Sequence, residues 1–296
     1  MKILIPGLVN NVQIQRLKEE AKKRGHVVDG CFGKEIVINA SKIEFTPNIR
    51  GKSLDSYDLL YLMVTRSRWE WYVASKYLKE NHGVKIVNQR IFTGDYNFFL
   101  TPAIDYYYQI KKGLPFPKSV IILSRNSVES ISKEFKFPVV LKLSNSQQGR
   151  GVFKVKSIEE LKTLIKEKID LAPSFIVRKF IENDGDIRVF TVGYKAIGAM
   201  KRTSPKGDFR SNISQGGKGS EFDLTKNPKV KEIAEKVSKT LQTEIAGVDI
   251  MLEKGTGDPY ILEVNLNPQF EGLERYTSAN AAEEIIKYFE KLHKGE

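Results

Sequence analysis

Residues 138–152 read PVVLKLSNSQQGRGV, a short apolar run followed by a loop of small polar residues and glycine. The run at residues 138–143 is typical of a buried strand, and it carries Lys142 near its end. The loop could bring backbone N–H groups against an anion, because glycine tolerates conformations that other residues avoid. A lysine beside such a loop suits a polyphosphate, whereas the alternative is a plain hairpin turn. The spacing matches neither the P-loop nor the dinucleotide-binding fingerprint.

A second segment, residues 260–268 (YILEVNLNP), places polar side chains inside an apolar strand. Side chains two apart on a strand share a face, so Glu263 and Asn265 point the same way. Asp249 lies in another apolar run, at residues 246–252. A carboxylate in such a strand is costly unless it is paired or binds a cation, and three oxygen ligands suit Mg²⁺. The trio predicts a magnesium site, and the alternative is an ion pair for each acid.

Arginines near further predicted strands form a third group. Arg188 follows Asp186 at the start of one strand, Arg202 ends the next, and Arg210 lies in the segment GDFRSN at residues 207–212. Positive side chains beside the acidic trio could neutralise charge on a transferred phosphoryl group. The alternative is that they are solvated surface arginines.

The first 90 or so residues predict a small parallel α/β domain. Apolar runs at residues 2–5, 27–28, 58–62 and 84–87 alternate with helical patterns at residues 14–25 and 70–79. An aromatic-rich helix is predicted at residues 94–112, and we place a domain boundary near Gly94. The rest predicts an α+β pattern, with helices at residues 127–135, 157–168, 228–241 and 279–292 and strands at residues 120–123, 138–143, 175–181, 187–192, 196–202, 246–252 and 260–264.

Length and composition set the class of protein. The 296 residues fit either two ordinary domains or one composite catalytic unit. A single cysteine, Cys31, excludes a disulfide within the chain, and with 3 histidines it favours oxygen ligands for any metal. No apolar run approaches the roughly 20 residues of a membrane helix, and we expect a cytoplasmic protein. The net charge of +12 favours anionic partners, the alternative being a lysine-rich soluble surface.

Taken in order, these segments resemble the ATP-grasp superfamily, and most closely its RimK-like branch of glutamate-adding ligases. The likeness covers about residues 138–268 and extends loosely over residues 1–28. It depends on the following motifs: FI at 180–181, DIR at 186–188, GDFRSN at 207–212, GG at 216–217, GVD at 247–249, EVN at 263–265, Pro268 and EG at 271–272. So many ordered segments make the resemblance specific.

The resemblance implies an α/β and α+β architecture, the ATP-grasp fold with an N-terminal Rossmann-like pre-ATP-grasp domain at residues 1–94. A central ATP-grasp subdomain would span residues 95–178 and a C-terminal one residues 179–296, with ATP between them. The implied reaction joins a carboxylate to an amine, adding glutamate or another amino acid. It would proceed through an acyl phosphate and release ADP and phosphate.

The resemblance also implies which residues bind ATP. Lys142 would hold the α- and β-phosphates, Lys179 and Phe180 would meet adenine, and Asp186 would approach the ribose. The remaining contacts would come from two loops, through Ser146, Gly149, Gly151, Arg210, Ser211 and Asn212.

Metal and catalytic positions follow from the same resemblance. Asp249, Glu263 and Asn265 would bind Mg²⁺ or Mn²⁺. Arg202 and Arg210 would be catalytic and stabilise the γ-phosphoryl group and the acyl phosphate. The chemistry then needs positioning and charge neutralisation rather than a nucleophilic side chain.

The chain departs from the RimK-like pattern at two places. The hinge usually carries a glutamate where this chain has Lys179, preceded by Arg178, so adenine contacts should come mainly from backbone groups. At the start of the central subdomain, the family pattern often has an aspartate followed by a lysine. In this chain Asp95 is followed by Tyr96 instead. Residues 66–72 (RSRWEWY) match nothing in the family, and they predict either a wall for an acidic substrate or a packed helix start.

Three functions stay open. A carboxylate–amine ligase is favoured over an ATP-grasp phosphoryl transferase (a kinase) and over a catalytically inactive basic module that binds nucleic acid or peptide. The retained Lys142 and acidic trio argue against the inactive module. The expected partners are amino acids or other small carboxylates and amines, or an acidic peptide or protein tail. Neither nucleic acid nor a membrane is expected, and a homo-oligomer is left open.

Overall fold

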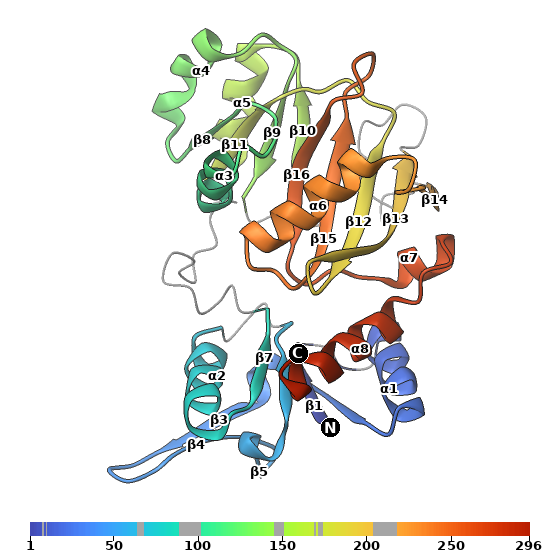
Figure 1. Ribbon diagram of the computed structural model, residues 1–296. Coiled ribbons are helices and arrows are strands. Elements are labelled where there is room, and N and C mark those ends of the chain that lie inside the picture. Colours follow the sequence, from blue (N-terminus) through green and yellow to red (C-terminus); the bar gives the residue numbers. More distant parts are fainter. Residues whose placement is uncertain are drawn as a thin grey trace.

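The computed structural model describes residues 1–7, 9, 11–63, 68–88, 102–144, 151–168, 170, 174–203 and 218–296. Within these residues the strands form four sheets. Figure 1 shows two of them in a lower N-terminal part and the other two in an upper part. None of the described helices combines the length and the apolar character needed to cross a bilayer.

The N-terminal sheet is parallel, as predicted. Its order is β2-β1-β6-β7, formed by β1 (Lys2–Pro6), β2 (Val27–Cys31), β6 (Leu59–Tyr61) and β7 (Lys85–Val87). Two helices connect the strands, α1 (Val12–Lys23) and α2 (Arg68–His82). Asn11 begins α1, because its side chain accepts a hydrogen bond from the Ile14 amide, which would otherwise have no partner in the first turn.

A small antiparallel sheet, which the sequence patterns did not predict, extends from this part. It contains β3 (Ile36–Ala40), β4 (Phe45–Ile49) and β5 (Lys52–Ser53). The ring of Phe45 packs on Tyr77 of α2, with centroids 4.9 Å apart. Pro47 lies within β4, and proline inside a run of residues argues against a strand in sequence reasoning.

The second sheet is antiparallel, with order β10-β9-β11-β8. Its strands are β8 (Ser119–Ile122), β9 (Val139–Leu143), β10 (Val152–Val155) and β11 (Phe175–Lys179). Helices α4 (Val128–Glu134) and α5 (Ile158–Lys168) bury one face, with Ile131 and Leu161 packed among Val139, Leu141 and Leu143. Since side chains alternate along a strand, Lys142 lies on the opposite face. The preceding helix, α3, spans Pro102–Lys111. Residues 94–101 of the predicted helix lie outside the described residues, and Lys112 lies in a turn.

The third sheet is also antiparallel, with order β14-β13-β12-β15-β16. Its strands are β12 (Asp186–Val192), β13 (Lys195–Thr203), β14 (Lys218–Glu221), β15 (Ile245–Leu252) and β16 (Pro259–Asn265). Helix α6 (Pro228–Thr240) covers one face through Ala234 and Val237, which pack on Val248 and Ile250. Side chains alternate along a strand, so the odd-numbered residues of β15, including Asp249, lie on the other face of the sheet.

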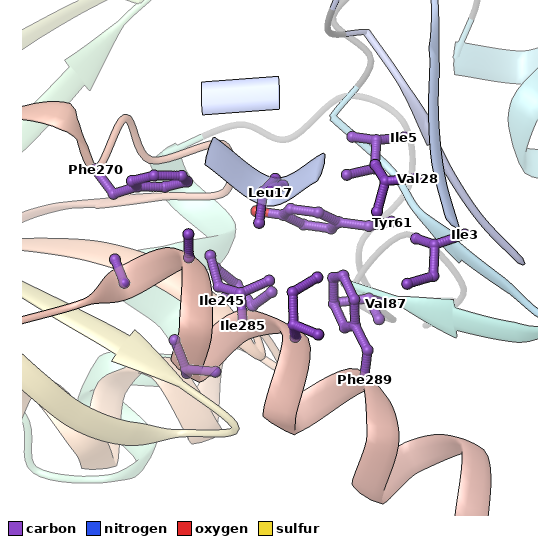
Figure 2. Packing of buried hydrophobic residues seen from close by; sticks show 14 of the residues in the cluster. Ile3, Ile5, Leu17, Val28, Tyr61, Val87, Ile245, Phe270, Ile285 and Phe289 are labelled. Atoms are coloured by element: carbon purple, nitrogen blue, oxygen red, sulfur yellow. The ribbon is translucent and has the colours of Figure 1, made fainter. Parts of the chain in front are cut away.

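The C-terminal helix α8 (Ala281–Lys294), which follows the short α7 (Glu271–Tyr276), packs on the N-terminal part (Figure 1). Figure 2 shows Ile285 and Phe289 of α8 beside Ile3, Leu17 and Tyr61, and these five side chains are almost fully buried. One hydrophobic core thus contains the two ends of the sequence. The sequence patterns predicted this helix but not its position.

Ion pairs at Glu290 join α8 to the end of α1. The Arg24 guanidinium donates to both carboxylate oxygens of Glu290, at 3.0 and 2.6 Å, and His26 Nε2 lies 2.8 Å from Oε1. The hydrogen bonds from Arg24 hold the pKa of Glu290 at about 2, below its ordinary value, and His26 adds to this effect. The carboxylate therefore stabilises the native state while it is ionised.

We expect Glu290→Gln to lower the free energy of unfolding by about 1 kcal/mol at pH 7, because a bidentate pair at a partly exposed site is lost. Glu290 has a depressed native pKa, so its contribution is present above the pKa of the unfolded chain and is lost as the pH falls toward 2. Denaturation of both proteins between pH 7 and pH 3 checks this. A difference that stays constant down to pH 3 would contradict it.

Candidate active site

Strand pairing in the third sheet brings the polar residues of β12, β13, β15 and β16 together. Asp186 lies opposite Arg202, Arg188 lies opposite Asp249, and Asp249 lies opposite Glu263. All of them lie on the face away from α6. Residues separated by up to 77 positions in the sequence therefore form one polar surface.

Asp249 is at the centre of this surface and is buried. Arg188 donates to both of its carboxylate oxygens at 2.8 Å, and Arg202 Nη2 lies 3.0 Å from Oδ2. Burial alone would raise the pKa of Asp249, but the charges of Arg188 and Arg202 hold it below its ordinary value. Asp249 is thus a carboxylate at neutral pH.

Arg202 is also buried and lies between two acids. Its Nε donates to Asp186 Oδ1 at 2.9 Å, and its Nη2 also bonds to Asp186. Burial opposes the charge of Arg202, yet Asp249 and Asp186 raise its pKa above the ordinary value. Gly185 permits this arrangement, because a side chain there would collide with the carbonyl oxygen of Arg202. The four residues Asp186, Arg202, Asp249 and Arg188 form one continuous ionic network.

This network places Asp186 and Arg202 in contact with each other, although the sequence predicted that one approaches ribose and the other the γ-phosphoryl group. Arg188 is not among the site residues that the sequence predicts. Its partner Asp249 is 61 positions away, and only the pairing of β12 with β15 brings them together.

Lys142 and Glu263 join the second and third sheets. Lys142 Nζ lies 2.6 Å from Glu263 Oε2, and the two side chains are 23% and 46% exposed. The lysine predicted to bind phosphate and the acid predicted to bind metal therefore meet at one solvent-accessible place between the sheets. Such a pair is weak in water and can be exchanged for other partners.

Asn265 completes the predicted trio. Its Nδ2 lies 3.3 Å from the Gly247 carbonyl oxygen and 3.4 Å from Asp249 Oδ2, which leaves Oδ1 as the atom suited to a cation. Asp249, Glu263 and Asn265 thus place hard oxygen atoms on neighbouring strands, and both oxygens of Asp249 already accept hydrogen bonds from arginine. No cluster of three or more His, Cys, Asp and Glu suited to a metal occurs in the described part of the chain. The donor set fits Mg²⁺, which usually takes one or two carboxylates and completes its shell with water and phosphate oxygens.

The predicted adenine hinge follows β11. Lys179 Nζ lies 3.4 Å from Glu253 Oε1, and its amide donates to the Lys118 carbonyl at 2.8 Å. Lys154 Nζ lies 3.8 Å from the ring centroid of Phe180. Lys154 is paired in register with Val140, two residues before Lys142, so the hinge and the phosphate lysine belong to the same side of the second sheet.

The two predicted loops are only partly described. Gly151 accepts a hydrogen bond from the Leu143 amide at 2.9 Å, which shows that β9 and β10 form a hairpin. Other loop positions lie outside the described residues: Ser146, Gly149, Arg210, Ser211, Asn212 and the Tyr96 region. Of the distinctive segment at residues 66–72, the structure describes residues 68–72, which begin α2. Trp71 is fully buried and donates to the Gly33 carbonyl at 2.8 Å, whereas Trp69 is 55% exposed.

Solved structures define the class of fold. The ATP-grasp ligase PsnB, complexed with minimal precursor, Mg and ADP, matches with a TM-score of 0.72 and 14% identity, over 99% of this chain and 98% of PsnB. D-alanine–D-alanine ligase from Bacillus anthracis, complexed with ATP, matches with a TM-score of 0.66 and 15% identity, over 100% of this chain and 99% of the ligase. The predicted ATP-grasp fold is confirmed.

Sequence relatives narrow the class to a family. A family model described as the RimK-like ATP-grasp domain matches residues 108–289. A probable alpha-L-glutamate ligase of Legionella pneumophila (strain Corby) is 30% identical over 288 residues, which cover 95% of this chain and 92% of the relative. The chain belongs to the RimK-like ATP-grasp family and is an ATP-dependent ligase that forms carbon–nitrogen bonds.

Proposed function

We propose that this ligase uses ATP to activate a carboxylate as an acyl phosphate and then couples it to an amine, with glutamate as the amino acid that is added. The single observation that carries the proposal is the contact between Lys142 and Glu263 at 2.6 Å. It brings a predicted phosphate ligand and a predicted metal ligand to one accessible site between two sheets. The name of the Legionella relative supports the choice of glutamate.

In this proposal, Lys142 binds the inner phosphates, together with the loop that contains Ser146, Gly149 and Gly151. Asp249, Glu263 and Asn265 hold Mg²⁺, which would neutralise phosphate charge. Lys142 and Glu263 exchange their mutual contact for these ligands when the nucleotide binds.

The nucleotide base and the outer phosphate have their own residues in the proposal. Backbone groups at Lys179 and Phe180 meet adenine. Arg202 would face the γ-phosphoryl group, together with the predicted contacts from Arg210, Ser211 and Asn212. Asp186 fixes the guanidinium of Arg202 through the hydrogen bonds described above, so that its charge is already oriented when phosphate charge develops.

The proposed reaction has two transfers. A carboxylate oxygen attacks the γ-phosphorus, the bond to the β-phosphate oxygen breaks, and ADP leaves. The amine nitrogen then attacks the acyl carbon, phosphate leaves, and the nitrogen loses a proton. The positive net charge of +12 favours acidic substrates, so glutamyl peptides and acidic protein tails are the acceptors to test first. The cytoplasmic location and any homo-oligomer stay predictions.

We expect ADP to form only when a suitable carboxylate is present, and hydroxylamine to convert the activated acyl group into a hydroxamate. Product analysis with MgATP, glutamate and a panel of carboxylates checks this. A phosphorylated hydroxyl product without hydroxamate would instead indicate a kinase. Formation of AMP and pyrophosphate would contradict both functions.

A further inference from the structure

Residues 266–268 directly follow Asn265, the last proposed metal ligand, and side chains of the N-terminal part hold them. Strand β16 ends at Asn265, so no strand ladder constrains the backbone beyond this point. The contacts to this segment come from α1 and from the end of β7, more than 170 positions earlier in the chain.

Asn88 makes the first of these contacts. It directly follows β7 and is buried, with 2% of its surface exposed. Its Nδ2 donates to the Leu266 carbonyl at 2.9 Å, and its Oδ1 accepts from the Ile245 amide at 3.3 Å. One amide group therefore joins the end of β16 to the start of β15, the two strands that carry Asp249, Glu263 and Asn265.

The backbone of Asn88 is adapted to this position. Its φ is 67°, in the left-handed region, which asparagine and glycine adopt more readily than other residues. In this conformation the amide group reaches Leu266 and Ile245 of the C-terminal region, while it also contacts Tyr61 of β6. Alanine would be strained here even before the loss of both hydrogen bonds is considered.

Gln13 and Gly247 hold the other end of the segment. Gln13 of α1 is 4% exposed, and its Nε2 donates to the Pro268 carbonyl at 3.0 Å. The ring of Pro268 lies over Gly247, where an added Cβ would approach Pro268 Cβ to 3.0 Å. Gly247 is also the register partner of Asn265. The segment is thus fixed from both sides.

We propose that Asn88, assisted by Gln13, is a positioning residue for magnesium binding: it holds the open end of β15 and β16 so that Asn265 and Glu263 keep their orientation toward Asp249. The N-terminal part is then a structural component of the metal site. This inference rests on the proposed function, because it takes these three residues as metal ligands.

The test compares ADP binding with and without MgCl₂ by calorimetry. Asn88→Gly removes the side-chain hydrogen bonds to Leu266 and Ile245 together with the contact to Tyr61, and it keeps the left-handed backbone without strain. We expect its affinity for ADP alone to equal that of the wild type, since Lys142 and the hinge are untouched. The gain in affinity on adding Mg²⁺ should be about tenfold smaller, because the partly buried Leu266 carbonyl and the buried Ile245 amide lose their partner. The Mg²⁺ concentration for half-maximal turnover should rise by about the same factor.

Gln13→Met provides a second variant of similar shape and removes one hydrogen bond, so we expect a shift of about threefold in the same direction. If Asn88→Gly does not fold, the Mg²⁺ response of Gln13→Met tests the inference. Glu290→Gln is the matched control. It breaks the contact between Arg24 and α8, which also joins the N-terminal part to the C-terminal region, but it leaves the contacts to residues 266–268 in place. It should lower stability and leave the response to Mg²⁺ as in the wild type.

An unchanged Mg²⁺ response in the folded variants overturns the inference, and so does an equal loss in Glu290→Gln, which would indicate general loosening. If ADP binding by the wild type does not respond to Mg²⁺, the proposed metal site itself is wrong. The two failures are therefore distinguishable.

Discussion

Glu263→Gln should reduce turnover by about 100-fold or more and change the free energy of unfolding by less than about 0.5 kcal/mol. The substitution keeps the shape of the side chain and removes a negative oxygen from the proposed metal site. The side chain is 46% exposed and its pair with Lys142 is solvent-accessible, so the fold loses little. Steady-state rates and urea denaturation measure the two effects.

Asp249→Asn should abolish turnover as well, but it should also destabilise the protein by about 3–5 kcal/mol. Asp249 compensates the charges of Arg188 and Arg202, both of which bond to it, and Arg202 is buried. Without the negative charge of Asp249, the positive charges of Arg188 and the buried Arg202 are no longer balanced. The sequence alone gives no reason to expect this loss of stability, because the pairing of Asp249 with Arg188 and Arg202 depends on the tertiary structure. Wild-type stability of Asp249→Asn would contradict the ionic network, and full Mg²⁺-dependent activity of both variants would contradict the metal site.

Phe289→Ala should destabilise the protein by about 3–5 kcal/mol, a large share of the stability of a typical domain. Phe289 is fully buried, and its ring meets that of Tyr61 edge-on with centroids 5.7 Å apart (Figure 2). The substitution opens a cavity between α8 and the N-terminal sheet. Urea denaturation of the purified variant measures the loss.

Lys291→Ala is the control for this prediction, because Lys291 is exposed on the same helix. Its effect should stay within about 0.5 kcal/mol. Equal changes in the free energy of unfolding for the two substitutions would contradict the prediction. They would mean that packing of α8 against the N-terminal sheet does not stabilise the protein.

The candidate site could be predicted from the sequence to the extent that its chemistry is local. Lys142 was identified because an apolar strand leads into a glycine-containing loop, and Glu263 and Asn265 because they alternate with buried residues on one strand. The roles of Arg188, Asn88 and Gln13 could not be predicted, since their partners lie 61, 178 and 255 positions away. No periodicity within a short window contains that information.

The sequence by itself determined the main helices and strands, the parallel character of the N-terminal sheet and the shared face of Glu263 and Asn265, because side-chain alternation and helical spacing are local properties of the chain. Only the tertiary structure decided which strands pair, that Asp249 shares two arginines, and that α8 returns to the first sheet. These features depend on register and packing between distant segments, whose free energy comes from burial and from compensation of charge in the folded chain.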